Sequence, residues 1–365
     1  MGGTNMPQKK AMIGMSGGVD SSVAAFLMLQ NSFDCIGATM RLYDNVLLPG
    51  ESGTCCSLDD VEDARSVAYR LGIAHHVFNF KETFEKQVIQ KFVRSYESGL
   101  TPNPCIDCNR HLKFRALLDR ARILGCDYVV SGHYARIRRD EETGRYLLCK
   151  AKDAAKDQTY FLACLDQNQM AHIQFPLGDL TKEEVRQIAQ EQGFVNARKH
   201  DSQDICFVPD GDYAAFLSRY TGKTYPAGDY LDVNGKVVGT HRGAVCYTLG
   251  QRKGLGIALG EPVYVCKKDM AHNTVTVGPN EALFSSALLA GDWNWFPFPA
   301  LTEPMAVTAK IRHSQYEQSA TVYPEGDGMA KVVFDAPQRA ITPGQAVVLY
   351  QGDLVIGGGT ITQAL

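Results

Sequence analysis

The stretch that decides the fold is Lys10-Ala11-Met12-Ile13-Gly14-Met15-Ser16-Gly17-Gly18-Val19-Asp20-Ser21-Ser22. Its first residues form a short apolar run that predicts a strand, and the apolar segment 22–30 predicts a helix that packs on a sheet. Gly17 and Gly18 let the backbone approach an anion without a Cβ clash, while hydroxyls and backbone amides supply donors. The following helix points its positive end at the same place. The stretch therefore predicts a phosphate-binding loop.

This loop differs from a Walker A motif because the lysine that would follow the second glycine is missing from the sequence. An ordinary glycine-rich turn is the simpler interpretation, but Ser-Gly-Gly-Xaa-Asp-Ser after a strand is more specific than a lone Gly-Gly pair. The loop resembles the PP-loop of the ATP pyrophosphatases, which cleave ATP to AMP and pyrophosphate. That resemblance implies that Asp20 helps to hold magnesium and pyrophosphate.

The pattern of strands and helices after the loop favours an α/β fold with a doubly wound parallel sheet. Further strands are expected at 35–40, 75–80 and 128–133, and helices at 57–71 and 110–124. Thr181-Lys182-Glu183-Glu184 is a capping box that opens another helix, which stops at Gly193.

The texture of the chain changes beyond about Asp210, where glycine and proline become frequent. Short strands are expected at 237–239 and 262–265. Alternation over 306–312, 320–323, 331–334 and 346–350 predicts a small antiparallel barrel. We therefore predict three domains: a PP-loop ATP-binding domain with a helical extension over 8–209, a central β-rich domain over 210–279, and a C-terminal β-barrel over 280–365.

Composition is ordinary for a globular protein of two or three domains. The chain has 365 residues, of which 45% are hydrophobic and 21% charged, with a net charge of −3. The sequence has neither an apolar run of the roughly 20 residues that a membrane helix needs nor an apolar signal core near its start, so we predict a cytoplasmic protein. Global charge does not indicate a nucleic-acid partner, so such binding must come from local basic patches.

The chain contains 11 cysteines, a count that in a protein of this size favours a reducing compartment over a disulfide framework. Most of them stand singly among apolar neighbours and are expected to be small core hydrophobes. These are Cys35, Cys126, Cys149, Cys164, Cys246 and Cys266. The adjacent pair Cys55-Cys56 is also interpreted as structural.

The second informative segment is Thr101-Pro102-Asn103-Pro104-Cys105-Ile106-Asp107-Cys108-Asn109. Two prolines stiffen it, and its thiols are expected beside the start of a basic helix, where a thiolate is stabilised and becomes reactive. A further cysteine, Cys206, lies in Asp201-Ser202-Gln203-Asp204-Ile205-Cys206-Phe207. Half a zinc site and a thioredoxin-like redox pair are the alternatives. The sequence lacks a second Cys-Xaa-Xaa-Cys and the βαβ pattern that these alternatives need.

Several motifs together resemble the bacterial tRNA-specific 2-thiouridylase family in order and spacing. They are the PP-loop, Gly37-Ala38-Thr39-Met40, Thr101-Pro102-Asn103-Pro104 with Cys108-Asn109, Gly132-His133-Tyr134-Ala135-Arg136, Lys156-Asp157-Gln158, 201–207 and 248–256. The resemblance covers nearly the whole chain. It implies an enzyme that converts the wobble uridine of certain tRNAs, at position 34, to 2-thiouridine with ATP, releasing AMP and pyrophosphate.

The resemblance also implies roles for individual residues. ATP would be bound by Gly14, Met15, Ser16, Gly17, Gly18, Val19, Asp20, Ser21, Met40 and Gly132. Cys206 would receive a persulfide from a sulfur-relay protein or a cysteine desulfurase, and Cys108 would release that sulfur and form a disulfide with Cys206. Asn103, Pro104 and Cys105 would lie against the target base. Further tRNA contacts would come from His133, Lys156, Asp157, Gln158, Arg312, His313 and Gln345, and from the central domain, with Lys, Glu and Gln isoacceptors as substrates.

The chain departs from some relatives at Cys105, where they carry aspartate, so a general-base role does not transfer to this position. Cys105, Cys108 and Cys206 could instead hold an iron–sulfur cluster with one open iron, because three thiolates leave a fourth site free. The sequence leaves both thiol mechanisms open. No other metal site is expected apart from magnesium with ATP.

Basic residues cluster after the thiols at Arg110, Lys113, Arg115, Arg120 and Arg122, and again at 136–139 and 252–253. Each cluster alone could be a solvated face; the resemblance favours contact with RNA. Two other functions stay open. One is a PP-loop ligase that adenylates a carbonyl for a nitrogen nucleophile and needs neither Cys108 nor Cys206. The other is a non-catalytic RNA-binding protein with a degenerate ATP site.

Overall fold

A computed structural model describes residues 8–43, 58–199 and 205–365, and the chain divides into two compact units. The first unit holds the residues before Ile89 together with Cys105–Pro209 and Asp353–Val355, and the second holds Ile89–Pro104, Asp210–Gly352 and Ile356–Leu365. The predicted structural pair Cys55-Cys56 and the motif residues 201–204 lie outside the described residues. The division into three domains remains a prediction.

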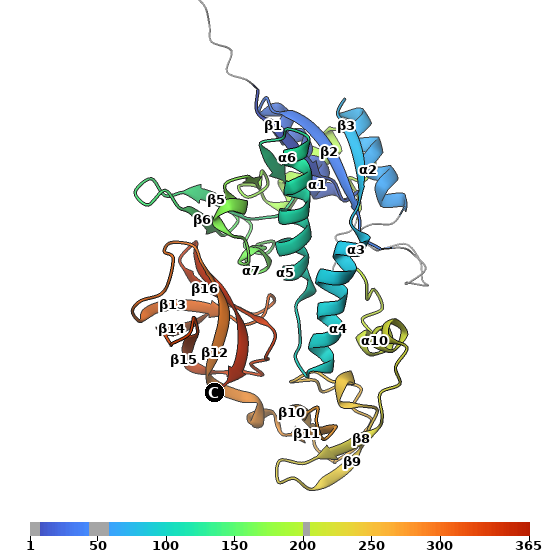
Figure 1. The fold of residues 1–365 in the computed structure, drawn as a ribbon, viewed down its shortest axis with the longest axis vertical. Helices are drawn as coiled ribbons and strands as arrows, with labels where there is room; N and C mark the ends of the chain where they lie inside the picture. Colours follow the sequence, from blue (N-terminus) through green and yellow to red (C-terminus); the bar gives the residue numbers. More distant parts are fainter. Residues whose placement is uncertain (1–7, 44–57, 200–204) are drawn as a thin grey trace, which may run out of the picture. The chain divides into compact units, whose positions relative to one another are not determined.

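The first unit is built on a five-stranded parallel sheet in the order β3-β2-β1-β4-β7, of which Figure 1 labels β1, β2 and β3. The strands are β1 (Lys10–Gly14), β2 (Asp34–Arg41), β3 (Ala74–Asn79), β4 (Tyr128–Val130) and β7 (Ile173–Gln174). Ile13 in the middle of β1 pairs with Gly37 on one side and Val130 on the other. The strand order reverses between β1 and β4, and ligands of open α/β sheets bind at the carboxyl ends of strands at such a point.

Helices cover this sheet because their apolar residues need a partner layer. Helices α1 (Val19–Gln30), α2 (Leu58–Arg70) and α9 (Lys182–Glu191) share one buried core with β1, through residues such as Val23, Val67 and Val185. Strands β5 (Arg136–Arg139) and β6 (Tyr146–Cys149) form a hairpin. The remaining helical segments of this unit are α3 (Lys81–Phe84), η2 (Glu85–Ile89), α5 (Pro104–Cys108), η3 (Asn109–Ala116), α6 (Leu117–Ile123), α7 (Thr159–Leu162) and α8 (Gln167–Met170). The predicted doubly wound parallel sheet is confirmed.

The second unit contains two β-structures, as the sequence predicts. A four-stranded sheet has the order β10-β11-β8-β9, with β8 (Gly228–Leu231), β9 (Val237–His241), β10 (Tyr264–Asp269) and β11 (Thr274–Gly278). The barrel strands are β12 (Phe284–Trp295), β13 (Met305–Lys310), β14 (Gln318–Pro324), β15 (Ala330–Arg339), β16 (Ala346–Gln351) and β17 (Leu354–Ala364), and pairing of β12 with β17 closes it. Helices α4 (Gln90–Glu97) and α10 (Tyr213–Thr221) and the short η4 (Ala244–Cys246) and η5 (Asn280–Leu283) complete the unit.

Three predicted boundaries are wrong. The helix after the loop begins at Val19 rather than Ser22, and the strand expected to reach His133 ends at Val130. The helix expected from Arg110 begins at Pro104 and runs through α5, η3 and α6 to Ile123. Proline is favoured in the first helical turn because its missing N–H has no partner there in any case.

Candidate functional site

The loop after β1 folds around its own serine hydroxyls. The Ser21 hydroxyl accepts a hydrogen bond from the Ser16 amide at 3.2 Å, and the hydroxyls of Ser21 and Ser22 each donate to the Gly18 carbonyl at 3.0 Å. Gly18 is the N-cap residue of α1 and has no side chain with which to cap the helix. The first amides of α1 therefore face the loop as donors for an anion.

Gly17 needs to be glycine for two reasons. Its φ is +74°, in the left-handed region, and a Cβ there would lie 2.7 Å from Cα of Asp60. The backbone of α2 thus closes the loop from one side. Asp60 is itself buried, at 7% exposure. Because Gly17 and Asp60 lie more than 40 residues apart, local sequence patterns do not predict this contact.

Asp20 is bonded by two residues that the sequence does not single out. Lys182 donates from Nζ to both carboxylate oxygens at 2.7 and 2.9 Å, and the Tyr134 hydroxyl donates to Oδ1 at 2.9 Å. The Lys182 side chain is only 10% exposed, so its ammonium is a nearly buried charge that needs a paired anion. The predicted capping box of Thr181 and Glu184 is confirmed, and it places Lys182 in the first turn of α9.

The Gly17 carbonyl is the second anchor of the loop. Asn196 donates from Nδ2 to this carbonyl and to the Ser22 hydroxyl, both at 2.9 Å. Lys199 reaches the same carbonyl at 3.4 Å and pairs with Asp60 and Asp63 at 2.7 Å. Asn196 is buried, and within the described part of the chain its Oδ1 has no hydrogen-bond partner. The segment after α9 therefore fixes the rear of the loop.

The carboxyl ends of β1, β2 and β4 gather the predicted nucleotide residues at one edge of the sheet. Met40 lies near the end of β2 and is half-buried. Gly132 follows β4, and a Cβ there would lie 2.6 Å from the carbonyl carbon of Asp20 and 2.7 Å from the Ser21 amide nitrogen. The residues 14–21, Met40 and Gly132 are thus brought together in this fold.

The thiols lie in different surroundings. Cys105 and Cys108 are inside helix α5 rather than before it, with Cys105 exposed and Cys108 only 9% exposed. Cys206 is half-buried, and its carbonyl accepts a hydrogen bond from the Tyr43 hydroxyl at 3.1 Å. The next residue, Phe207, is buried and packs edge-on against Phe84 at 5.8 Å. The chain around Cys206 is therefore anchored by apolar contacts.

Six other thiols are poor nucleophiles; five of them are buried, and Cys266 is half-buried. Burial raises the pKa of Cys35 to about 11 and that of Cys164 to about 12. Burial also raises the pKa values of Cys126, Cys149, Cys246 and Cys266. A thiol with a raised pKa carries little thiolate at neutral pH and is a poor nucleophile, which agrees with the structural role predicted for these six.

His133 packs against Phe114 and Phe175, with ring centroids 5.6 and 6.0 Å away. Burial lowers the pKa of His133 well below its ordinary value, and the nearby Lys113 charge lowers it further. Its Nδ1 lies 2.5 Å from the Ser131 hydroxyl. A neutral imidazole at pH 7 can offer one donor or acceptor to RNA without charge.

The predicted tRNA-contacting residues 157 and 158 also have structural bonds within this unit. Asp157 accepts from the Ala151 amide at 3.0 Å and the Thr159 hydroxyl at 2.5 Å. Gln158 accepts from the Tyr134 amide at 2.9 Å. Because the Tyr134 hydroxyl bonds Asp20, the irregular segment before α7 is linked to the phosphate loop through Tyr134. Lys156 next to it is half-buried.

In the second unit, Gln345 holds the segment that leads to the target-base residues. Its Nε2 donates to the carbonyls of Thr101 and Pro102 at 2.9 and 3.2 Å, and the Thr101 amide donates to the Pro343 carbonyl at 3.0 Å. Asn103 is half-buried and Pro104 is buried. This geometry favours an indirect role for Gln345, through the position of residues 101–104.

Arg312 and His313 lie together at the end of β13 but differ in exposure. The Arg312 guanidinium donates to the carbonyls of Arg339 and Ala340, which fixes its position in the barrel. His313 is exposed. Of the two predicted contacts, His313 presents more of its side chain to a partner.

Within residues 8–43, 58–199 and 205–365, no group of three His, Cys, Asp or Glu side chains could hold a metal ion. Cys105, Cys108 and Cys206 therefore do not fit an iron–sulfur cluster as the structure places them. In the same ranges, no helix is long and apolar enough to cross a membrane.

The parallel sheet and its loop define a nucleotide-binding α/β domain of the PP-loop class, which uses ATP. A family model described as the tRNA methyl transferase HUP domain matches residues 9–210, more than half of the chain. Models described as the tRNA methyl transferase PRC-barrel domain and the aminomethyltransferase beta-barrel domain match 214–279 and 285–361.

Relatives narrow this class to one family. The tRNA-specific 2-thiouridylase of Clostridioides difficile is 50% identical over 98% of this chain and 99% of its own length, and that of Moorella thermoacetica is 52% identical over 96% and 98%. The chain belongs to the tRNA-specific 2-thiouridylase family. A crystal structure of a 4-thiouridine synthetase–RNA complex with bound ATP has 18% identity and a TM-score of 0.35, covering 55% of this chain and 45% of that one.

Proposed function

We propose that this chain is a tRNA-uridine 2-sulfurtransferase. It adenylates the oxygen on carbon 2 of the wobble uridine with ATP, and then replaces that oxygen with sulfur from a persulfide on Cys206. The observation that carries this proposal is the braced loop at the switch point of the sheet, in a chain whose relatives at about 50% identity are thiouridylases. Those relatives favour sulfur transfer over the methyl transfer that the names of the matching domain families suggest.

The first half-reaction makes a poor leaving group into a good one. The uracil oxygen attacks the α-phosphorus of ATP, and pyrophosphate leaves. The backbone amides at the start of α1, where Gly18 offers no capping side chain, are suited to donate to the phosphates. Their fixed geometry supplies stabilisation for the charge that develops as pyrophosphate departs.

Asp20 and Lys182 are the charged groups of this step. The Asp20 carboxylate is suited to hold magnesium with the pyrophosphate part of ATP, since carboxylates and phosphate oxygens are its preferred ligands. Lys182, now 2.7 Å from that carboxylate, is close enough to share its charge with the phosphates. The Tyr134 hydroxyl, which donates to Oδ1, holds the carboxylate in place.

The second half-reaction needs sulfur at the oxidation level of sulfide. The Cys108 thiolate attacks the inner sulfur of the Cys206 persulfide, so that a Cys108–Cys206 disulfide forms and hydrosulfide leaves. Hydrosulfide attacks carbon 2 of the adenylated uridine, and AMP departs with the original oxygen. The two electrons that reduce the sulfur come from the two thiols, and an external dithiol must reduce the disulfide before the next turnover.

The substrate is recognised as a folded RNA whose reactive base is extruded. Arg115, Arg120 and Arg122 on the helix that follows Cys108 are exposed and can approach phosphates. We propose Asn103, Pro104 and Cys105 as contacts of the extruded uridine, with His133, Lys156 and His313 as further tRNA contacts. Lys, Glu and Gln isoacceptors are the expected substrates, and a persulfide relay protein or cysteine desulfurase the expected donor.

The test is a reconstituted reaction. The protein is incubated with ATP, magnesium, a persulfide donor and unmodified tRNA, and the nucleosides are analysed by mass spectrometry. We expect 2-thiouridine at position 34, with AMP and pyrophosphate. Release of AMP without 2-thiouridine would reject sulfur transfer and favour a ligase with a nitrogen nucleophile. Tight tRNA binding without AMP release would favour the RNA-binding alternative.

Cys105 separates the two thiol mechanisms. A Cys105→Ser variant loses one ligand that a three-thiol cluster needs, whereas the persulfide route uses only Cys108 and Cys206. We expect this variant to retain 2-thiouridine formation within about threefold of the wild type when a persulfide is the donor. Anaerobic analysis of iron and sulfide, with activity that depends on the iron, would instead support the cluster.

A further inference from the structure

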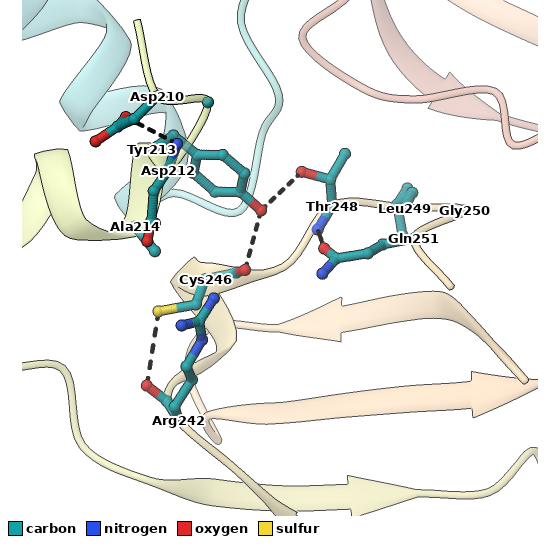
Figure 2. A pocket seen from close by; sticks show the side chains of 11 residues that line it. Asp210, Asp212, Tyr213, Ala214, Arg242, Cys246, Thr248, Leu249, Gly250 and Gln251 are labelled. Carbon is teal, nitrogen blue, oxygen red and sulfur yellow. Dashed lines mark hydrogen bonds between the residues drawn. The ribbon is translucent and has the colours of Figure 1, made fainter. Parts of the chain in front are cut away.

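A cavity of about 550 Å³ lies in the second unit (Figure 2), and its lining residues fall between Asp210 and Gln251, far along the chain from the phosphate loop. Its walls come from the start of α10, from the residue after β9 and from the segment 246–251. Its lining includes polar and charged side chains, namely Asp210, Asp212, Tyr213, Arg242, Thr248 and Gln251. The volume lies in the range of pockets that bind small organic ligands.

Tyr213 is fixed as a wall of this cavity. Its hydroxyl donates to the Cys246 carbonyl at 2.9 Å and lies 3.2 Å from the Thr248 hydroxyl, as Figure 2 shows. Its ring stacks on Tyr96 of α4 with centroids 4.6 Å apart. Three elements of the second unit thus hold one aromatic side chain, which is the rigidity expected of a preformed site.

Another wall of the cavity is the loop 248–254, which Gln251 stabilises with two side-chain hydrogen bonds. Its Oε1 accepts from the Thr248 amide at 3.0 Å, and its Nε2 donates to the Lys253 carbonyl at 3.0 Å. Gly250 and Gly254 have positive φ values of +81° and +74°, so this loop turns sharply on both sides of Gln251. The turn presents Arg252 and Lys253 as exposed cations.

The acidic side chains of the cavity have hydrogen-bond or ion-pair partners, whereas its arginine has no carboxylate partner among the described residues. Asp210 lies 3.9 Å from Arg219 and accepts from the Asp212 amide, while Asp212 accepts from the Ala215 amide as the N-cap of α10. Arg242 is exposed. Among the residues that the structure describes, no carboxylate pairs with its guanidinium, and the same is true of Arg252 and Lys253.

We propose that this cavity receives one unpaired nucleotide of the tRNA substrate, other than the uridine that reacts. The base enters the cavity and the Arg242 guanidinium donates to its acceptor edge, while Arg252 and Lys253 neutralise the flanking phosphates outside. The base rather than the phosphate lies inside, because the Asp212 carboxylate would repel an anion. Arginine is suited to acceptor pairs on base edges, and unpaired RNA bases are the usual targets of such recognition.

The inference rests on the proposed function in taking tRNA as the substrate. Its test compares Arg242→Ala with Arg242→Lys and with Lys236→Ala, a control that removes an exposed cation between β8 and β9 of the same unit. The dissociation constant of unmodified tRNA is measured at fixed salt, ATP affinity is measured separately, and circular dichroism melts check folding.

We expect Arg242→Ala to weaken tRNA binding about 10-fold, Arg242→Lys to recover part of the loss, and Lys236→Ala to stay within twofold. ATP affinity should be unchanged in all three. Chemical probing of the bound tRNA should show one protected nucleotide outside position 34 that becomes reactive in Arg242→Ala.

Equal tRNA affinity for Arg242→Ala and Lys236→Ala would overturn the proposal. So would weaker binding of free mononucleotides to Arg242→Ala with tRNA binding intact, since the cavity would then be an effector site. Loss of tRNA binding with an unchanged footprint would also reject it. If wild-type protein makes no 2-thiouridine but Arg242→Ala still weakens tRNA binding and alters the footprint, the proposed function fails and this inference stands.

Discussion

The phosphate loop and the thiols are held in different ways. The loop is bonded on both sides by side chains from distant parts of the chain, with Lys182 and Tyr134 on Asp20 and Asn196 on the Gly17 carbonyl. The thiols instead span the whole range of exposure, from the exposed Cys105 to the buried Cys108, with Cys206 between them.

The two half-reactions proposed for this chain would account for this difference. Phosphate charge must meet donors that are already fixed, because reorganising them during the reaction would raise the barrier. A thiol that accepts sulfur from another protein must be reachable, whereas a thiol that attacks within the protein does not need to be. The half-exposed Cys206 and the buried Cys108 fit these two roles.

The largest expected effect comes from the thiols. Cys108→Ser and Cys206→Ser should each lower 2-thiouridine formation at least about a thousandfold, because serine replaces a sulfur nucleophile. AMP release in the presence of tRNA should persist within a few-fold. Cys266→Ser is the control, since this thiol has a raised pKa and donates to a backbone carbonyl, that of Tyr264. If either Cys108→Ser or Cys206→Ser still formed 2-thiouridine at the wild-type rate, the proposed division of labour between the thiols and the phosphate loop would be contradicted.

The charged pair of the loop should give the opposite pattern. Asp20→Asn and Lys182→Met should each lower tRNA-dependent AMP release about 100-fold, because each removes a fixed charge from the phosphate site. Transfer of persulfide onto Cys206, followed by mass spectrometry of the protein, should be unaffected. Glu62→Gln is the matched control, because it breaks an exposed ion pair with Arg65 on α2. Impaired loading of Cys206 in Asp20→Asn would show that the two regions are coupled.

A smaller effect is expected from packing at the loop. Gly132→Ala places a methyl group against the backbone of the first turn of α1, so we expect the free energy of unfolding to fall by about 1–3 kcal/mol, with weaker ATP binding. Gly326→Ala, where a Cβ would meet no atom within 4 Å, should leave both unchanged. Equal melting temperatures for the two variants would show that the loop tolerates displacement.

The smallest expected effect is a pH dependence of stability from His133. Its pKa is lowered in the folded protein, so below about pH 6.5 the unfolded chain binds a proton that the native protein does not. Stability therefore falls as pH falls from about 6.5 toward the lowered pKa. Between pH 7 and 5.5, His133→Asn should reduce the loss in the free energy of unfolding by about 1 kcal/mol. An identical decline in both proteins, measured by urea titration, would contradict a neutral buried imidazole.

The sequence predicts the sheet and the loop well because local patterns determine them. An apolar run, two glycines and an apolar helix suffice to predict the loop after β1. Local patterns do not predict the side chains that hydrogen-bond to the loop, since Lys182 and Asn196 lie 162 and 179 positions from their partners. The capping box around Lys182 gave the only local signal, and it indicated a helix start rather than a ligand.

The sequence patterns do not predict the barrel strands β12 and β17. For β17 the reason is its glycine content. Strand β17 contains Gly357-Gly358-Gly359, and glycine is depleted in strands. The rings of Trp293 and Trp295 on β12 cover this segment, because Cβ atoms at Gly359 and Gly357 would meet them at 2.7 and 2.6 Å. Cross-strand packing supplies what local propensity lacks. The thiols, similarly, proved to be inside a helix because Pro104 begins it.

The most direct measurement follows one labelled sulfur atom from the protein to the tRNA. Protein carrying a ³⁴S persulfide on Cys206 is separated from the donor, and then mixed with ATP, magnesium and unmodified tRNA in a single turnover. We expect the label to appear in 2-thiouridine with one AMP per sulfur transferred, and the protein to carry a Cys108–Cys206 disulfide. Release of AMP with the label still on the protein, or unlabelled 2-thiouridine, would contradict transfer through these two thiols.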